Sequence, residues 1–267
     1  MPSTEEIGKG GTQFSTAAAP GAVRPGPVAR LRYYLTFVVA ALCFLILGVP
    51  VIPLGYLLRR FFGVKDFICP FGRFGARLYM RTAGMRIHVI GRERLDPQQP
   101  YVFVANHQSN LDPPLIFACV GRNPSFLVKK ELFRIPVFAQ GIRLIDMVPV
   151  DRTDRESALA STRLAAERLK GGRSYAGFPE GTRSADGRVR EFKKGLFYMA
   201  VGAGVPVVPL VINDTRRVMR KGANYCVPGD VFMEILPPVS TAGYTPENID
   251  ELVTKVREQF VPRVLTD

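Results

Sequence analysis

Residues 101–114 read YVFVANHQSNLDPP, and they combine a strand, a turn and the start of a helix. The apolar run at residues 101–105 predicts a buried strand, and Gln108-Ser109-Asn110 is a turn-forming sequence. Asp112 followed by Pro113 is typical of a helix start, with Asp112 as the N-cap. The stretch therefore indicates an α/β unit.

The same alternation continues toward the C-terminus. We predict strands at residues 86–90, 101–105, 125–129, 147–150, 174–178, 206–212 and 231–236. We predict helices at residues 112–120, 155–170, 194–203 and 248–263. Because strands and helices alternate, the predicted fold class is α/β, a sheet with helices on both faces.

Composition and charge limit the possible classes of function. Of the 267 residues, 47% are hydrophobic, which is enough for a substantial core. The net charge is +13, which favours an anionic partner such as nucleic acid, phospholipid headgroups or a phosphorylated substrate. The four cysteines form no CxxC pair, so we expect neither a disulfide framework nor a metal site.

The N-terminal part of the chain differs from the rest. Residues 1–29 are rich in small and polar residues and predict a disordered tail, residues 30–62 a membrane-associated helical anchor, and residues 63–267 an α/β domain. Residues 33–58 carry no charge over 26 positions, and a helix spanning a membrane needs about 20. Pro50 and Pro53 predict a break of this run into pieces of about 17 and 5 residues.

A basic stretch follows the apolar run. Within it, one stripe of arginines and one stripe of apolar residues stand at helical spacing. They predict an amphipathic helix lying on an anionic membrane, although Gly72 and Gly75 weaken that helix. The alternative is a solvated cationic face over an ordinary core stripe. The cationic stripe is Arg73, Arg77 and Arg81, and the apolar stripe is Phe71, Phe74 and Leu78.

His107 and Asp112 are the candidate catalytic residues. On a continuous helix they would point about 140° apart, so they can meet only if the segment between them turns. A carboxylate bound to one imidazole nitrogen leaves the other nitrogen as a base. Such a pair without a protein nucleophile is suited to deprotonating a substrate hydroxyl, and the alternative is a His–Asp capping interaction.

A second polar stretch, FPEGTRS at residues 178–184, follows another predicted strand. Backbone N–H groups near Gly181 and the guanidinium of Arg183 suit an oxyanion such as phosphate. Glu180 could hold Arg183 or accept a hydroxyl. The alternative is a polar loop with a structural Glu–Arg pair.

Together these stretches resemble the glycerolipid acyltransferase family, which includes the bacterial 1-acylglycerol-3-phosphate acyltransferases. The resemblance covers residues from about 85 to 237. Four blocks stand in the family's order: NHQSNLD, the segment VKKELFRIPVFAQGIRLIDMVPVDR at residues 128–152, FPEGTRS, and VPVVPLVI at residues 205–212. The leading apolar segment is also usual in the bacterial members.

The resemblance implies a reaction without an enzyme nucleophile. A lysophospholipid hydroxyl attacks the thioester of acyl-CoA or acyl-carrier protein, which are co-substrates, and the product is phosphatidic acid for phospholipid synthesis. By resemblance His107 removes the hydroxyl proton and Asp112 orients it. The implied glycerol-phosphate site is Glu180, Gly181, Thr182 and Arg183, and Lys129 or Lys130 would stabilise the thioester oxyanion or contact phosphate. No metal or other cofactor is implied.

Other classes of function fit less well. A metal hydrolase lacks ligands, and a nucleic-acid binder lacks an aromatic-basic signature or a recognition helix. Ser174 lies in a G-x-S-x-G-like stretch but precedes a strand, where a nucleophile elbow does not belong. A non-enzymatic membrane-surface protein, and an acyltransferase using glycerol-3-phosphate or another lysolipid such as lyso-ornithine lipid, remain alternatives. We interpret His88 as structural, and Pro209 as shaping the acyl site.

The expected location is the cytoplasmic face of the cell membrane. Basic residues flank the apolar run on both sides, and Lys and Arg tend to remain cytoplasmic. A shallow, tilted insertion into one leaflet satisfies both flanks, and a single-span anchor is the alternative. The flanking residues are Arg24, Arg30 and Arg32 before the run and Arg59 and Arg60 after it.

Overall fold

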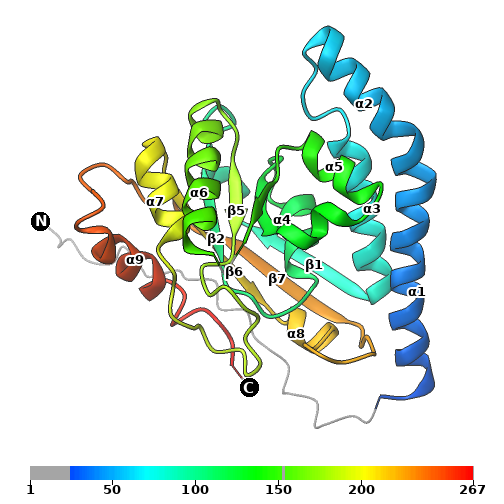
Figure 1. Cartoon of the computed structure of the whole chain (residues 1–267). Helices are drawn as coiled ribbons and strands as arrows, with labels where there is room; N and C mark the ends of the chain where they lie inside the picture. Colours follow the sequence, from blue (N-terminus) through cyan, green and yellow to red (C-terminus); the bar gives the residue numbers. More distant parts are fainter. Residues whose placement is uncertain (1–24, 152–153, 267) are drawn as a thin grey trace, which may run out of the picture.

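The structure is a computed structural model that describes residues 25–151 and 154–266. Figure 1 shows a central sheet with helices packed against it and one long helix along its side. Most of the predicted tail, residues 1–24, lies outside the described residues, and the first helix already begins at Pro27. A proline is well tolerated at this position because a helix's first N–H groups have no intrahelical acceptor.

All seven predicted strands are present and form one sheet. In chain order they are β1 (Met85–Ile90), β2 (Val102–Ala105), β3 (Ser125–Lys129), β4 (Val148–Val150), β5 (Tyr175–Gly177), β6 (Val207–Asn213) and β7 (Gly229–Ile235). Their order across the sheet is β1-β7-β6-β2-β5-β3-β4.

The direction of the strands determines where loops can meet. β6, β2, β5, β3 and β4 run parallel to one another, whereas β7 is antiparallel to β6, and β1 is parallel to β7. The carboxyl ends of β6, β2 and β5 are therefore adjacent at one edge of the sheet. In open α/β sheets this edge is the usual place for a ligand site.

Helices cover both faces of the sheet, which confirms the predicted fold class. On one face lie α3 (Cys69–Ala83) and α4 (Asp112–Cys119), and on the other lie α6 (Arg155–Lys170), α7 (Gly195–Ala203) and α9 (Ile249–Glu258). Phe103 and Ala105 of β2 pack toward the first group, and Val102 and Val104 toward the second. Because both faces are covered, β2 is apolar throughout. Two short helices, α5 (Phe138–Leu144) and α8 (Thr215–Val218), were not predicted.

The predicted break at Pro50 and Pro53 is wrong. α1 (Pro27–Cys43), a π-helical segment (Phe44–Gly48) and α2 (Val49–Phe62) form one 36-residue helix, about 54 Å long. Prolines interrupt an α-helix because they lack an N–H and crowd the carbonyl four residues earlier. The wider π turn lies just before Pro50, where a local change in hydrogen bonding can accommodate the proline.

Both ends of this helix are bound to the sheet domain. Near its start, the Ala29 carbonyl accepts a hydrogen bond of 3.0 Å from the Cys226 N–H. Near its end, Arg59 donates to the Leu144 carbonyl and to the Asp146 carboxylate, both at 2.9 Å. Between these points α1 packs along α3 and α2 contacts α5 (Figure 1).

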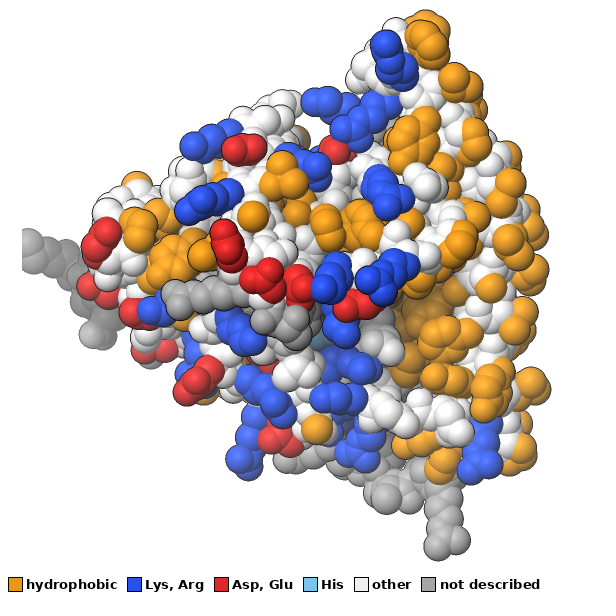
Figure 2. All heavy atoms as spheres, in the orientation of Figure 1, with side chains coloured by type: hydrophobic (Ala, Val, Ile, Leu, Met, Phe, Trp, Pro, Cys, Tyr) orange, Lys and Arg blue, Asp and Glu red, His pale blue; other side chains and the backbone are white. Residues whose placement is uncertain are grey.

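The opposite side of the same helix is apolar and exposed. The most apolar 18-residue window of Pro27–Phe62 has a mean hydropathy of 2.8 and is only 11% buried. Figure 2 shows the resulting hydrophobic surface along the right edge of the molecule, where α1 and α2 lie. An exposed apolar face of this length is typical of a surface that contacts a membrane or another protein.

The predicted stripes of α3 are present, and the cationic one also contacts the sheet domain. Arg73 hydrogen-bonds the side chain of Asn123, and Arg77 donates to the Ala118 carbonyl at 3.3 Å, while Arg77 and Arg81 are exposed. Phe71 and Phe74 of the apolar stripe are 37% and 59% exposed, so this stripe does not lie in the core. The arginines can act this way because they satisfy carbonyl and amide oxygens around the end of α4.

Candidate functional site

The turn after β2 holds the candidate His–Asp pair. Asp112 is the first residue of α4 and not its N-cap, which is Leu111. Its carboxylate turns back toward the preceding loop, where Oδ2 accepts the N–H groups of Gln108 and Ser109 at 2.7 and 2.8 Å. These two bonds close the turn, so the five-residue spacing brings Asp112 next to His107.

The two side chains are in direct contact. His107 Nδ1 lies 2.7 Å from Asp112 Oδ2, and Asp112 is fully buried whereas the His107 side chain is 16% exposed. The carboxylate of Asp112 can only accept hydrogen bonds, so Nδ1 of His107 carries the proton of this bond. Nε2 of His107 then presents its lone pair. The pair therefore has the geometry of an oriented general base.

The FPEGTRS loop, which follows β5, packs directly on His107. The Phe178 ring stacks on the imidazole with centroids 3.9 Å apart and an interplanar angle of 17°. The Ser184 N–H donates to the His107 carbonyl at 2.7 Å, and Glu180 Oε1 accepts the His107 N–H at 3.0 Å. The loop thus fixes both the backbone and the ring plane of His107.

Glu180 faces inward, so the structure does not pair it with Arg183. Only 5% of the residue is exposed, and its Oε2 atom is buried without a hydrogen-bond partner in the described part of the chain. Burial raises the pKa of this carboxyl group from 4.5 to about 7, against the lowering effect of the His107 N–H. Its contact with the backbone of His107 indicates a role in positioning the loop.

We expect Glu180→Gln to change how stability depends on pH. Because the pKa is raised in the folded protein, folded wild type binds more protons than the unfolded chain between pH 5 and 8, and its stability falls as pH rises. Glutamine removes this titration while it can still accept the His107 N–H. Burying its amide nitrogen adds an offset that does not depend on pH.

Denaturant unfolding of both proteins at pH 5 and pH 8 measures the effect. The stability difference, variant minus wild type, should shift in favour of the variant by up to about 3 kcal/mol between these pH values. A difference that stays constant with pH would contradict the raised pKa of Glu180.

The rest of the loop carries one cation that has no partner among the residues the structure describes. Gly181 has φ +71°, which glycine adopts without strain, and a Cβ there would lie 3.2 Å from Lys193 Nζ. Its N–H donates to the Phe178 carbonyl at 3.0 Å, so this N–H serves the turn and not an anion. Thr182 is exposed, and the Arg183 guanidinium makes no hydrogen bond or ion pair with the residues that the structure describes. Arg183 is therefore available to an anionic ligand.

Further basic residues surround this loop. Lys221, which follows α8, donates to the Arg183 carbonyl at 3.3 Å and so connects the two segments. In Figure 2 Lys and Arg side chains gather over the lower middle of the molecule. The basic residues of the two segments are Arg183, Arg188, Arg190, Lys193, Lys194, Arg216, Arg217, Arg220 and Lys221. Lys194 is ion-paired with Asp250 and Arg217 with Asp214, and the remaining positive charge favours a phosphorylated substrate.

Lys129 and Lys130 lie farther from the pair. Lys129 ends β3, which is two strands from β2 and so about 10 Å away across the sheet. Lys130 forms an ion pair with Asp151 that holds its ammonium group and raises its pKa. Of the two, Lys129 is the more available to a substrate that extends across the strand ends.

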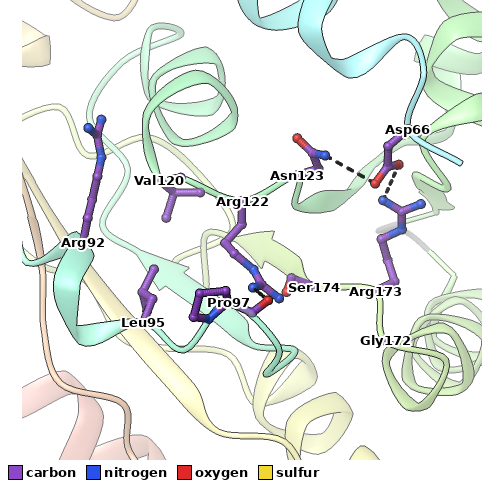
Figure 3. Close-up of a pocket in the computed structure, with 11 residues that line it drawn as sticks. Asp66, Arg92, Leu95, Pro97, Val120, Arg122, Asn123, Gly172, Arg173 and Ser174 are labelled. Carbon is purple, nitrogen blue, oxygen red and sulfur yellow. Dashed lines mark hydrogen bonds and ion pairs between the residues drawn. The ribbon is translucent and has the colours of Figure 1, made fainter.

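The position of Ser174 argues against a role as nucleophile. It is 5% exposed, it stands before β5, and its Oγ accepts the Tyr101 N–H at 3.1 Å. It lines a cavity of about 490 Å³ at the amino ends of β2, β3 and β5, the edge opposite His107 (Figure 3). The arginines there are bound: Arg122 to carbonyls of the loop before β2, and Arg173 to Asp66 and Asp146.

The sequence did not indicate every residue that supports the site. The Asn106 side chain exchanges two hydrogen bonds of 2.8 Å with the backbone of Ile212 on β6. Thr215 donates to Asp112 Oδ1 at 2.6 Å. Both contacts join segments more than 100 residues apart, so local pattern carries no signal for them. Among the described residues no cluster of three or more His, Cys, Asp and Glu side chains could hold a metal ion.

Comparisons with known proteins identify the family of the chain. A family model described as Acyltransferase matches residues 86–213. The 1-acyl-sn-glycerol-3-phosphate acyltransferase BAT2, chloroplastic, of Brassica napus is 32% identical over 241 residues, covering 85% of this chain and 68% of that protein. The 1-acyl-sn-glycerol-3-phosphate acyltransferase alpha of Mus musculus is 33% identical over 181 residues, covering 67% of this chain and 63% of that protein.

A solved structure is similar to this chain over nearly the whole length of the solved protein. The crystal structure of the 1-acyl-sn-glycerophosphate (LPA) acyltransferase PlsC from Thermotoga maritima matches with a TM-score of 0.73 and 30% sequence identity. The match covers 90% of this chain and 97% of that one. The similarity therefore includes the N-terminal helical part as well as the sheet domain.

Proposed function

The chain belongs to the acyltransferase family that includes the 1-acyl-sn-glycerol-3-phosphate acyltransferases, and we propose that it acylates 1-acylglycerol-3-phosphate to phosphatidic acid. The acyl donor is a thioester, either acyl-CoA or acyl-carrier protein. The observation that carries this proposal is the imidazole of His107, bound at Nδ1 by buried Asp112, with Arg183 on the loop that packs against His107.

His107 and Asp112 supply the proton transfers of a direct acyl transfer from donor to acceptor. Nε2 of His107 takes the proton of the acceptor hydroxyl as its oxygen attacks the thioester carbonyl carbon. Asp112 stabilises the imidazolium that forms. The tetrahedral intermediate then collapses, the C–S bond breaks, and the imidazolium returns the proton to the leaving thiolate. No bond to the enzyme forms in this sequence.

The acceptor's phosphate would bind at Arg183, with Lys193 and Lys221 adding positive charge nearby. A guanidinium binds two phosphate oxygens at once, which fixes the direction of the glycerol hydroxyl toward His107. Lys129 would contact the thioester oxygen or a phosphate of the donor. These roles are supported by position and by the absence of competing partners for Arg183 among the described residues.

We expect Arg183→Lys to raise the acceptor's KM about tenfold and to change kcat much less. Lysine keeps the positive charge but cannot bind two oxygens in one plane. Titration of lysophosphatidate at saturating acyl donor measures the effect, and exposed Arg188→Lys in the same loop is the matched control. If only the donor's KM rises, Arg183 binds the donor and not the acceptor.

The experiment that tests the proposed function is an acceptor and donor panel with the purified protein. Lysophosphatidate, glycerol-3-phosphate and lyso-ornithine lipid are each offered with acyl-CoA or acyl-carrier protein, and the labelled products are separated. We expect lysophosphatidate to give the highest kcat/KM. A preference for glycerol-3-phosphate or lyso-ornithine lipid would assign the site to that acceptor. If no acceptor is acylated, the result favours the alternative of a non-enzymatic membrane-surface binding protein.

The long N-terminal helix suggests how the enzyme meets its lipid substrate. Its two ends are bound to the same polar domain, at Ala29 and at Arg59, while its outer face is apolar. A helix held in this way along the domain cannot cross a bilayer end to end. We infer that its outer face inserts into one leaflet of the cell membrane from the cytoplasmic side, where acyl donors are available.

Cysteine labelling tests this arrangement. Val28 and Phe62 are 68% and 75% exposed at opposite ends of the helix. Cysteines at these positions, in a background without the four native cysteines, should both react with an impermeant reagent from the cytoplasmic side only. If position 28 reacts from one side of the membrane and position 62 from the other, the helix spans the bilayer.

A further inference from the structure

Strand β6 and the segment that follows it bind the loop of the His–Asp pair at three points. Asn106 is bonded to the backbone of Ile212, as described above. The Ser109 hydroxyl donates to the Met219 carbonyl at 2.7 Å. The Thr215 hydroxyl donates to Asp112 Oδ1 at 2.6 Å. Only the last of these bonds reaches a side chain of the His–Asp pair, that of Asp112.

The two oxygens of Asp112 have different partners. Oδ2 accepts three hydrogen bonds, from His107 Nδ1 and from the N–H groups of Gln108 and Ser109. Oδ1 accepts the Thr215 hydroxyl, and both Asp112 and Thr215 are fully buried. A buried carboxylate oxygen needs a hydrogen-bond donor in place of water, and the Thr215 hydroxyl is the donor to Oδ1.

We propose that Thr215 is a positioning residue for the acyl transfer, acting on His107 through Asp112. The inference rests on the proposed function and deepens it. One donor on Oδ1 and three on Oδ2 fix the carboxylate plane, and that plane sets the direction of the bond to Nδ1. Threonine suits this task because its β-branched side chain has few rotamers, so the hydroxyl is held in place.

Removal of the hydroxyl should disturb the pair without unfolding the domain. Valine has the shape of threonine but leaves Oδ1 buried without its donor. The carboxylate is then free to rotate, and its hydrogen bond no longer holds the Nδ1–H tautomer as firmly. The Nε2 atom that should accept the substrate proton would carry a proton itself in part of the molecules.

Kinetics give the first test. We expect Thr215→Val to lower kcat about 10- to 100-fold, with the acceptor's KM nearly unchanged, and Thr215→Ser to retain most of the activity. Thr241→Val is the matched control because Thr241 is also buried and donates to a backbone carbonyl, that of Val205, at 3.1 Å. This control should lose stability without a change in kcat.

Nitrogen-15 NMR of the imidazole gives a test that does not depend on turnover. The chain has only two histidines, so a His88→Gln background leaves His107 as the one imidazole signal. We expect the Nδ1–H tautomer in this background and in Thr215→Ser, and a larger share of the Nε2–H tautomer in Thr215→Val. If the wild type acylates no lysolipid, the proposed function fails, but this comparison still decides the role of Thr215.

Several outcomes would overturn the inference. They are a Thr215→Val protein with wild-type kcat and an unchanged tautomer, a Thr215→Ser protein as impaired as Thr215→Val, and an equal loss of kcat in Thr241→Val. Circular dichroism shows whether each variant folds. Should Thr215→Val not fold, Thr215→Cys, a weak donor of similar size, takes its place, and wild-type kcat in that variant counts against the role of the hydroxyl.

Discussion

Replacing His107 by alanine should lower kcat for acyl transfer by about 10²- to 10⁴-fold, the usual contribution of a general base. The proposed reaction has no nucleophile on the enzyme, so without His107 the acceptor hydroxyl must attack while it still carries its proton. The fold should persist because Asp112 keeps its bonds from Gln108, Ser109 and Thr215. Steady-state assay with lysophosphatidate and acyl-CoA measures the loss.

The chain supplies a matched control in its other histidine. His88 also stacks on a phenylalanine, Phe232, and also contacts a carboxylate, with Nε2 lying 3.0 Å from Asp230. It is exposed on β1, three strands from β2. His88→Ala should therefore keep wild-type activity, and equal losses in the two variants would show that His107 contributes only to folding.

The second large effect is expected for Asp112→Asn, with kcat reduced by about 10²- to 10⁴-fold. The amide can be accommodated, since its oxygen can take the three bonds of Oδ2 while its nitrogen donates to the Thr215 hydroxyl oxygen. The fold should thus remain intact. What is lost is the negative charge that stabilises the imidazolium formed when His107 accepts the hydroxyl proton.

Thermal unfolding separates this effect from a loss of structure. The melting temperature and the circular dichroism spectrum of Asp112→Asn should stay close to those of wild type while kcat falls. A folded variant that keeps wild-type kcat would contradict the role of Asp112.

Much of the sheet domain could be predicted from sequence because its signals are local. β2 is buried on both faces and is apolar throughout, and Asp112-Pro113 lies at the start of α4. Strand order was not predictable, because the antiparallel pairing of β7 with β6 depends on contacts between distant segments. The break assigned to Pro50 and Pro53 was wrong: a π turn precedes Pro50, and Pro53 lies inside the continuous helix α2.

In the candidate site, too, local contacts could be predicted from the sequence and contacts between distant segments could not. The His107–Asp112 contact could be predicted because the turn between them is encoded in five residues. The inward orientation of Glu180 could not, because the pattern EGTR does not tell whether a carboxylate faces Arg183 or the backbone of His107. Thr215 was missed because its partner lies 103 positions earlier in the chain.

The central claim is that the acceptor hydroxyl attacks the thioester directly, with His107 as the base. Intact-protein mass spectrometry, on samples quenched during turnover with lysophosphatidate and acyl-CoA, tests it most directly. The account predicts that phosphatidic acid accumulates while the enzyme keeps its unmodified mass at every time point. An acyl adduct on Ser174, on Thr215 or on any cysteine that forms and decays at the rate of turnover would contradict it.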